Sequence, residues 1–82
     1  MYALIYSDAA LKQLKKLDKP IQERILSAIE RIQVRPESFI SKLVGRDACK
    51  FRVGDYRIIL DIMQDRMLIL VIEIGHRKNI YN

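Results

Sequence analysis

The chain has 82 residues, of which 15 are Lys or Arg and 10 are Asp or Glu, and half are hydrophobic. This composition predicts one small globular domain over residues 1–82 and excludes a disordered chain. The single cysteine, Cys49, excludes an internal disulfide and a cysteine-rich zinc site, and indicates a reducing, cytoplasmic setting. The net charge of +5 favours an anionic partner, either a nucleic acid or an acidic protein.

Neither a signal peptide nor a membrane span is expected. The opening stretch MYALIY has no basic segment ahead of its apolar residues. The longest apolar run, MLILVI, is far shorter than the ~20 residues of a transmembrane helix. We therefore expect a soluble protein with no membrane partner.

The first part of the chain predicts one strand and two helices. Residues 2–6 form a short strand, and Ser7 is a suitable N-cap for the helix that follows it. This first helix has one apolar face, made of Ala10, Leu11, Leu14 and Leu17. A second helix begins after Asp18, tolerates Pro20 in its first turn and ends before Pro36.

The two helices predict a helical hairpin with a basic outer surface. The apolar stripe of the second helix consists of Ile21, Ile25, Ala28, Ile29 and Ile32. The outer faces of both helices carry Lys12, Lys15, Lys16, Lys19, Arg24 and Arg31. These charges are either an ordinary solvated surface or a basic surface that rests on a polyanion. Residues 35–47, with their Pro, Ser and Gly, predict a loop.

From Cys49 onward the apolar residues recur at every second position, which predicts strands over 49–53 and 56–62. Gly54–Asp55 between them is a two-residue hairpin turn. This turn sets Arg52 directly opposite Arg57 and Lys50 opposite Ile59. One face of the hairpin is therefore apolar and must pack on the helices, while the other carries three cations.

The last predicted strand, MLILVIEI, is apolar on both faces and is therefore expected in the interior of the sheet. A loop of Gln64, Asp65 and Arg66 would place Glu73 opposite Arg57 and direct Arg77 toward the same face.

The opposed arginines have two interpretations, because like charges that face each other on a sheet cost stability. In the first, Arg52 and Arg57 extend into water or are neutralised by Glu73 and Asp61. In the second, Lys50, Arg52 and Arg57 hold a phosphate, whose oxygens fit the planar fork of arginine. The ending GHRKNIY would then add His76, Arg77, Lys78 and Tyr81 where the last strand ends.

The order of strand, helical hairpin and three-stranded antiparallel meander, with KFRVGDYRIIL and IGHRKNIY, resembles the RelE/ParE toxin superfamily, and most closely its RelE branch. The resemblance implies an α+β fold with both helices on one face of a twisted sheet, as in microbial ribonucleases. It also implies a toxin of a type II toxin–antitoxin system that cuts messenger RNA in the ribosomal A site, with no metal and no cofactor. The implied partners are an acidic, RelB-like antitoxin in a heteromeric complex, and the ribosome with its message.

The same resemblance implies roles for individual residues. The catalytic positions correspond to Lys50, Arg57, Arg77 and Tyr81. The supporting or RNA-binding positions correspond to Arg46, Arg52, Glu73, His76 and Lys78. This sequence departs from some members at Ala48, where they carry a further lysine, and in its shorter stretch between Arg77 and Tyr81. The proton acceptor therefore stays open among Lys50, Glu73 and His76.

The reaction implied is attack by the 2′-hydroxyl of the RNA on the adjacent phosphate. Arg57 and Arg77 would stabilise the phosphorane, Lys50 and Arg52 would orient the backbone, and Tyr81 would stack on a base. A second class of function also remains open, either a ParE-like inhibitor of DNA gyrase or an inactive RelE relative that acts only through its antitoxin complex. ParE-type chains usually lack the full basic cluster and the terminal tyrosine, which favours the nuclease.

Overall fold

The computed structural model describes residues 1–38, 40–42 and 48–76. The elements in these ranges are β1 (Ala3–Tyr6), α1 (Asp8–Lys15), α2 (Lys19–Ile32), η1 (Pro36–Ser38), β2 (Ile40–Lys42), β3 (Cys49–Val53), β4 (Tyr56–Met63), η2 (Gln64–Arg66) and β5 (Leu68–His76). The strands form one mixed sheet in the order β1-β5-β4-β3-β2. β1 runs parallel to β5, and the other neighbours are antiparallel.

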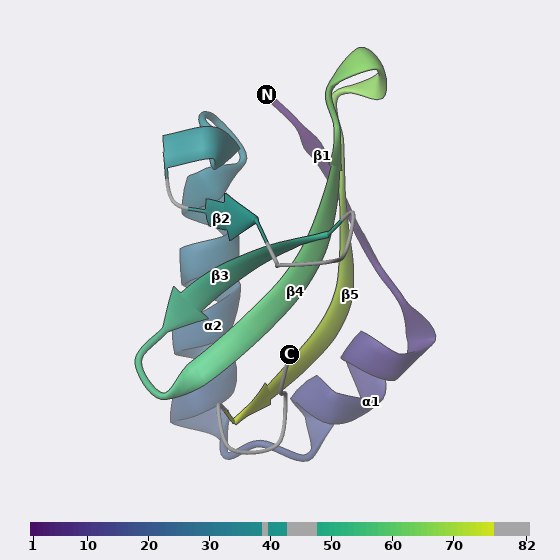
Figure 1. Ribbon diagram of the computed structural model, residues 1–82. Coiled ribbons are helices and arrows are strands. Elements are labelled where there is room, and N and C mark those ends of the chain that lie inside the picture. Colours follow the sequence, from purple (N-terminus) through teal and green to yellow (C-terminus); the bar gives the residue numbers. More distant parts are fainter. Residues whose placement is uncertain (39, 43–47, 77–82) are drawn as a thin grey trace.

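Both helices lie on the same side of the sheet, as Figure 1 shows, and the predicted α+β architecture is confirmed. α1 packs on β5 and α2 packs on β3. Between the layers, Ile25 and Ile29 of α2 belong to the same core cluster as Ile58 and Leu60 of β4, and all four side chains are fully buried. None of the described helices lies over the opposite face of β3 and β4, which carries the predicted cations (Figure 1).

α1 begins as predicted. The Ser7 side chain accepts a hydrogen bond from the Ala10 backbone N–H at 3.0 Å, and its hydroxyl donates to the Ile72 carbonyl at 2.7 Å. The predicted apolar face is wrong at Leu11, which is 41% exposed. Gln13 contacts the sheet instead, where its Oε1 accepts a hydrogen bond from the Ile74 backbone N–H at 2.7 Å. A polar residue thus helps to join α1 to β5.

α2 also occupies its predicted range, and Ile25, Ala28, Ile29 and Ile32 are buried as expected. Asp18 is the N-cap residue by position, but its side chain makes no capping hydrogen bond. The six cations predicted on the outer faces of the two helices are all exposed. Within the described ranges, neither helix has the length and hydrophobicity needed to cross a membrane.

The prediction of a loop over residues 35–47 is wrong at Ile40–Lys42, which forms the edge strand β2. Ile40 pairs with Phe51, and Lys42 pairs with Cys49. Three residues are too few to display an alternating pattern, so β2 depends on pairing with β3 and not on its own sequence.

The β3–β4 hairpin has the predicted register, with Val53 opposite Tyr56 and Lys50 opposite Ile59. Gly54 has a φ of +58°, and no other residue of the turn has a positive φ. Glycine at the first of two turn positions is the requirement of a type II′ hairpin turn. The sequence therefore determines the position of this hairpin locally.

The predicted register between β4 and β5 is wrong, because Glu73 pairs with Ile59 and Arg57 pairs with Gly75. Two features cause the difference. The connecting loop extends through Met67, and a β-bulge leaves Ile72 without a partner between the Leu60–Val71 and Ile59–Glu73 pairs. Each feature alone would turn Glu73 to the other face, since side chains alternate along a strand. Together they keep Glu73 on the predicted face but place it opposite Ile59, two residues along β4 from its predicted partner Arg57.

Candidate functional site

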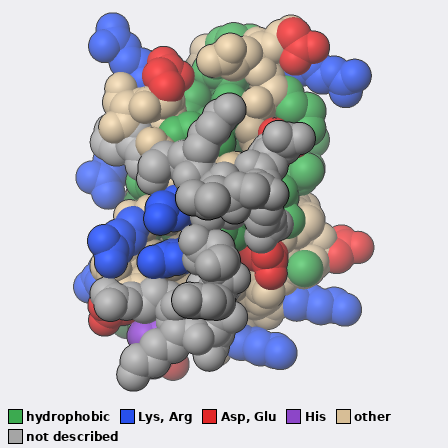
Figure 2. Space-filling model, in the orientation of Figure 1, with side chains coloured by type: hydrophobic (Ala, Val, Ile, Leu, Met, Phe, Trp, Pro, Cys, Tyr) green, Lys and Arg blue, Asp and Glu red, His purple; other side chains and the backbone are tan. Residues whose placement is uncertain are grey.

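The candidate site is the basic face, which we define as Lys50 and Arg52 on β3 together with Arg57 on β4. Arg52 and Arg57 are directly opposed, and Lys50 lies two residues before Arg52 on the same side of its strand. Arg52 is exposed, whereas Lys50 and Arg57 are partly buried. Figure 2 shows Lys and Arg side chains gathered over β3 and β4 on the face away from the helices. The three cations predicted from the hairpin are therefore brought together.

An apolar base supports the basic face. Ile59 lies between Lys50 and Glu73 in one row across β3, β4 and β5, and is only 1% exposed. Ala48 and Ile72 pack against it in a small cluster separate from the main core. Charges beside such a base interact more strongly than charges surrounded by water. Ala48, where the resemblance made a further lysine the alternative, is therefore part of this base.

The carboxylates proposed to neutralise the arginines differ in position. Glu73 is diagonal to Arg57, because its direct partner is Ile59. Asp61 shares the face of Arg57 but lies four residues further along β4, about 13 Å away in an extended strand. Asp61 is therefore too far along β4 to face Arg57, whereas Glu73 remains a diagonal neighbour within reach of a long side chain. Of these two carboxylates, only Glu73 lies close to the basic face.

His76 does not join the basic face. It pairs with Tyr56 on the side of the sheet that carries the helices, and the two rings meet edge to face with their centroids 5.4 Å apart. Both residues line a hollow of about 400 Å³ with Gln13, Lys16 and Leu17 near the end of α1, and the edge of β5 at Glu73, Ile74 and Gly75 completes its lining. Of the three candidate proton acceptors, Lys50 and Glu73 therefore share the face of Arg57, and His76 lies on the other face.

The remaining site residues from the sequence, Arg46, Arg77, Lys78 and Tyr81, lie outside the described residues. Within the described ranges, no group of three or more His, Cys, Asp or Glu side chains is close enough to hold a metal ion.

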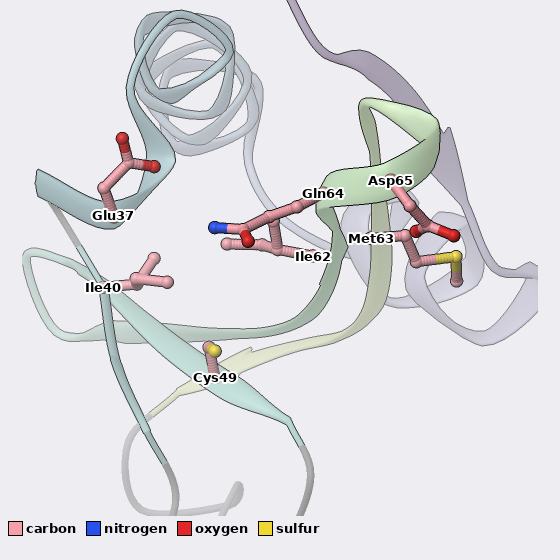
Figure 3. A pocket seen from close by; sticks show the side chains of 7 residues that line it. All are labelled: Glu37, Ile40, Cys49, Ile62, Met63, Gln64 and Asp65. Carbon is pink, nitrogen blue, oxygen red and sulfur yellow. The ribbon is translucent and has the colours of Figure 1, made fainter.

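A second concavity, of about 790 Å³, has a different chemistry. Figure 3 shows Ile62 and Gln64 entering it from one side, with Glu37 and Ile40 on the other and Cys49 at its base. Met63 and Asp65 complete its lining. The hollow is largely apolar, and the charged groups among its lining residues are two carboxylates, which would repel a phosphate. It is therefore not a candidate for holding RNA.

Two arginines that the sequence placed only on the helix surface lie close to the basic face. Arg24 and Arg31 of α2 line a third concavity together with Arg52. Their spacing of seven residues puts them on one side of the helix, which is visible in the sequence. The packing of that side against the end of β3 is a tertiary contact, and no local pattern predicts it.

Comparison with known proteins gives a consistent result over nearly the whole chain. Residues 4–81 match the family described as the ParE toxin of the type II toxin–antitoxin system, parDE. A putative RelE-like toxin protein of Escherichia coli is 28% identical, over 99% of this chain and 90% of its own length. The mRNA interferase toxin RelE of Escherichia coli K12 is 26% identical, over 94% of this chain and 84% of its own length.

Solved structures show the same fold. The archaeal RelE–RelB complex from Pyrococcus horikoshii contains a chain with a TM-score of 0.80 and 26% identity, covering 96% of this chain and 98% of that chain. The RelBE2 toxin–antitoxin complex from Mycobacterium tuberculosis gives a TM-score of 0.85 at 20% identity, with 93% and 98% covered. Each of these two structures is a complex of a toxin with its antitoxin.

Proposed function

Because the chain belongs to the ParE toxin family of type II toxin–antitoxin systems, within the RelE/ParE superfamily, we propose that it is a ribosome-dependent endoribonuclease that cleaves messenger RNA. The observation that supports this activity is the basic face, where Arg52 and Arg57 oppose each other beside Lys50. Three cations held on an apolar base are preorganised for a phosphate whose negative charge increases during reaction.

The reaction begins with attack by the 2′-oxygen on the adjacent phosphorus. The bond from phosphorus to the 5′-oxygen breaks, the 2′ proton passes to an acceptor, and the leaving 5′-oxygen takes up a proton. Arg57 stabilises the phosphorane, with Arg77 in the same role by the family match. Lys50 and Arg52 orient the backbone, and Tyr81 stacks on a base.

The row across the sheet suggests how the protons move. Lys50 and Glu73 stand on either side of Ile59, and their strands are separated by one intervening strand, or about 10 Å. A phosphate above Ile59 would lie within reach of both side chains. A carboxylate is a common proton acceptor and an ammonium a common proton donor in catalysis, so we assign the acceptor role to Glu73 and the donor role to Lys50. Few side chains of the protein are available to position the reacting groups, so the ribosome supplies much of the orientation of the substrate.

The partner that controls the activity is an antitoxin. The solved relatives are toxin–antitoxin complexes. We assign the partner of this chain to an acidic, RelB-like protein that covers the basic face in a heteromeric complex in the cytoplasm. A disordered acidic segment that folds on binding would suit such a surface.

A second candidate is inhibition of DNA gyrase, and the observation that favours it is the match to the ParE family description. In that case the basic face would contact an acidic surface of a protein or DNA and would perform no chemistry. If the chain is instead an inactive RelE relative that acts only through its antitoxin complex, it will neither cleave messenger RNA nor inhibit gyrase.

One experiment separates these functions. Purified protein is added to ribosomes that carry a defined message, new RNA ends are mapped, and a gyrase supercoiling assay is run with the same preparation. Cuts within the codon of the A site, together with unaffected supercoiling, support the nuclease. Blocked supercoiling with an intact message supports the gyrase inhibitor, and an effect in neither assay excludes both.

A further inference from the structure

A groove of about 360 Å³ lies between α2 and the end of the β3–β4 hairpin, beside the basic face. Arg24 and Arg31 line it from α2, and Arg52 lines it from β3. We call this the arginine groove. Its remaining lining consists of Ala28, Phe51, Val53 and Gly54.

Local sequence explains why the groove exists. Arg24, Ala28 and Arg31 follow the i, i+4, i+7 spacing of one helix face. Ala28, which is 2% exposed, is small enough to let α2 approach β3 between the two arginines. Gly54 has no side chain, and a Cβ placed there would lie 3.4 Å from Nη1 of Arg24. The guanidinium of Arg24 therefore lies beside the hairpin turn, and it shares the groove with Arg52.

The charges of the groove are uncompensated within the described part of the chain. Arg24, Arg31 and Arg52 are all exposed, and none of them forms an ion pair with an acidic residue in those ranges. Three cations that converge without a counter-charge produce a local positive potential that attracts an anion.

We propose that the arginine groove binds the phosphate backbone of RNA on one side of the cleavage site and so orients the protein on the ribosome. The proposal rests on the proposed function, because Arg52 belongs to both the groove and the basic face. Arg52 connects the groove to the basic face. Positive charge therefore extends from Arg57 on the open face of the sheet, past the end of β3, to Arg31 on α2.

The spacing and burial of the lining residues indicate the kind of ligand. Arg24 and Arg31 are seven residues apart, or ~10 Å along the helix axis, which suits two separate phosphates better than one small anion. Phe51 is only 6% exposed, so it offers no ring on which a base could stack. The groove therefore contacts the backbone and reads no sequence.

The same burial argues against an acidic peptide as the ligand. Ala28, Phe51 and Val53 form the floor of the groove and are all less than 10% exposed. Peptide interfaces depend on apolar anchors that fill a desolvated pocket. This floor offers little apolar area to such an anchor, whereas a chain of phosphates needs only the arginines on the rim.

The test compares two double variants with equal loss of charge. Arg24→Gln with Arg31→Gln removes the groove contacts on α2, and Lys12→Gln with Lys15→Gln removes two exposed charges from α1. Binding of each protein to purified ribosomes and to a fluorescein-labelled oligouridylate is measured across 50–200 mM salt, the range in which phosphate contacts show a large effect. Cleavage of ribosome-bound message gives kcat and KM, and the RNA ends are mapped.

For the arginine variant we expect KM to rise about tenfold with kcat nearly unchanged. The slope of log K against log salt should decrease by roughly 0.7–0.9 per lost contact for both RNA probes. The pattern of cut sites should not change, and the lysine variant should resemble the native protein.

Three results would overturn the proposal. The first is an unchanged salt slope in the arginine variant, and the second is an equal loss in the lysine variant. The third is unchanged binding of both RNA probes together with weaker binding of an acidic, RelB-like protein measured in the same way, which would make the groove a protein-docking surface. If the native protein cleaves no message, the nuclease assignment fails, while the two binding measurements still decide whether the groove holds RNA.

Discussion

Arg52 and Arg57 lie directly opposite each other across β3 and β4, so two like charges occupy one pair of the antiparallel ladder. Such a pair costs roughly 0.2–1 kcal/mol of stability. Both residues are on strands whose other faces are occupied by Phe51, Val53 and Ile58 in the core. The two arginines therefore point away from the core, on the open face of the sheet.

The first prediction concerns Arg57→Gln. The substitution relieves the like-charge pair and removes a bidentate donor from the transition state. We expect an unchanged or raised melting temperature together with a fall in cleavage of about 10²–10³-fold, which is typical of losing one preorganised donor. Thermal unfolding and cleavage of ribosome-bound message are measured on the same preparation.

Arg66→Gln is the matched control for this variant, because Arg66 is exposed in η2 at the far end of β4. It should leave both measurements close to native values. An Arg57→Gln protein that is destabilised yet cleaves normally would show that Arg57 serves the fold, and the basic face would then be ordinary surface charge.

The second prediction is that cleavage needs no metal at the catalytic site. The described residues offer no cluster of His, Cys and carboxylate ligands, and in the proposed mechanism the arginines and lysine stabilise the charge on the phosphorane. Activity should survive an excess of chelator once enough magnesium is restored to keep the ribosome assembled. Loss of activity under these conditions that only a transition metal reverses would refute the assignment.

The third prediction concerns Ser7, which connects the start of α1 to the bulge in β5. Its side chain caps the helix at Ala10 and donates to the carbonyl of Ile72, and its backbone N–H donates to the carbonyl of Val71 at 2.9 Å. Ser7→Ala should lower the free energy of unfolding by about 1 kcal/mol, the usual cost of losing a cap. In a domain of this size that loss lowers the melting temperature by about 4–8 °C.

Hydrogen exchange adds a local measurement to this variant. The amides that follow the bulge, at Glu73 and Ile74, should exchange faster in Ser7→Ala than in the native protein. Ser7→Thr keeps the hydroxyl and should restore most of the stability. If the alanine variant is as stable as the native protein, the hydroxyl contributes neither to the cap nor to the bulge.

The fourth prediction is a pH dependence that involves Tyr6. Burial raises the pKa of Tyr6 above its ordinary value of 10.0, and the negative charge of Glu30 raises this pKa further. The folded state therefore favours the neutral phenol. The contribution of Tyr6 to stability is complete below pH 10 and is lost as the pH rises through the higher pKa of the folded state.

Urea unfolding on either side of pH 10 checks this prediction against a Tyr6→Phe variant. The native protein should lose more stability than the variant as the pH rises, since the titration of Lys residues and other tyrosines is common to both. Equal losses in the two proteins would show that Tyr6 titrates normally in the folded state.

The sequence was sufficient where a local rule decides the structure. The Gly54–Asp55 turn set the hairpin register and thereby the relation between Arg52 and Arg57. The apolar stripe of α2 identified the residues that face the core. In both cases a short stretch contains all the information, because turn geometry and helix period depend only on neighbouring residues.

The sequence was insufficient where distant segments decide the structure. The parallel pairing of β1 with β5 joins the two ends of the described chain, and no local pattern indicates it. The loop before β5 extends through Met67 in a left-handed conformation with a φ of 52°, which methionine rarely adopts. Proximity in sequence groups His76 with the arginines, whereas strand alternation turns it toward Tyr56.

Ile72 is the position at which β5 can lose a residue and keep its register. Its removal would leave Val71 opposite Leu60 and Glu73 opposite Ile59, and it would restore regular alternation between the two faces of the sheet. We therefore expect natural length variation within β5 to occur at the bulge, where one residue more or less leaves the side chains on either side in place.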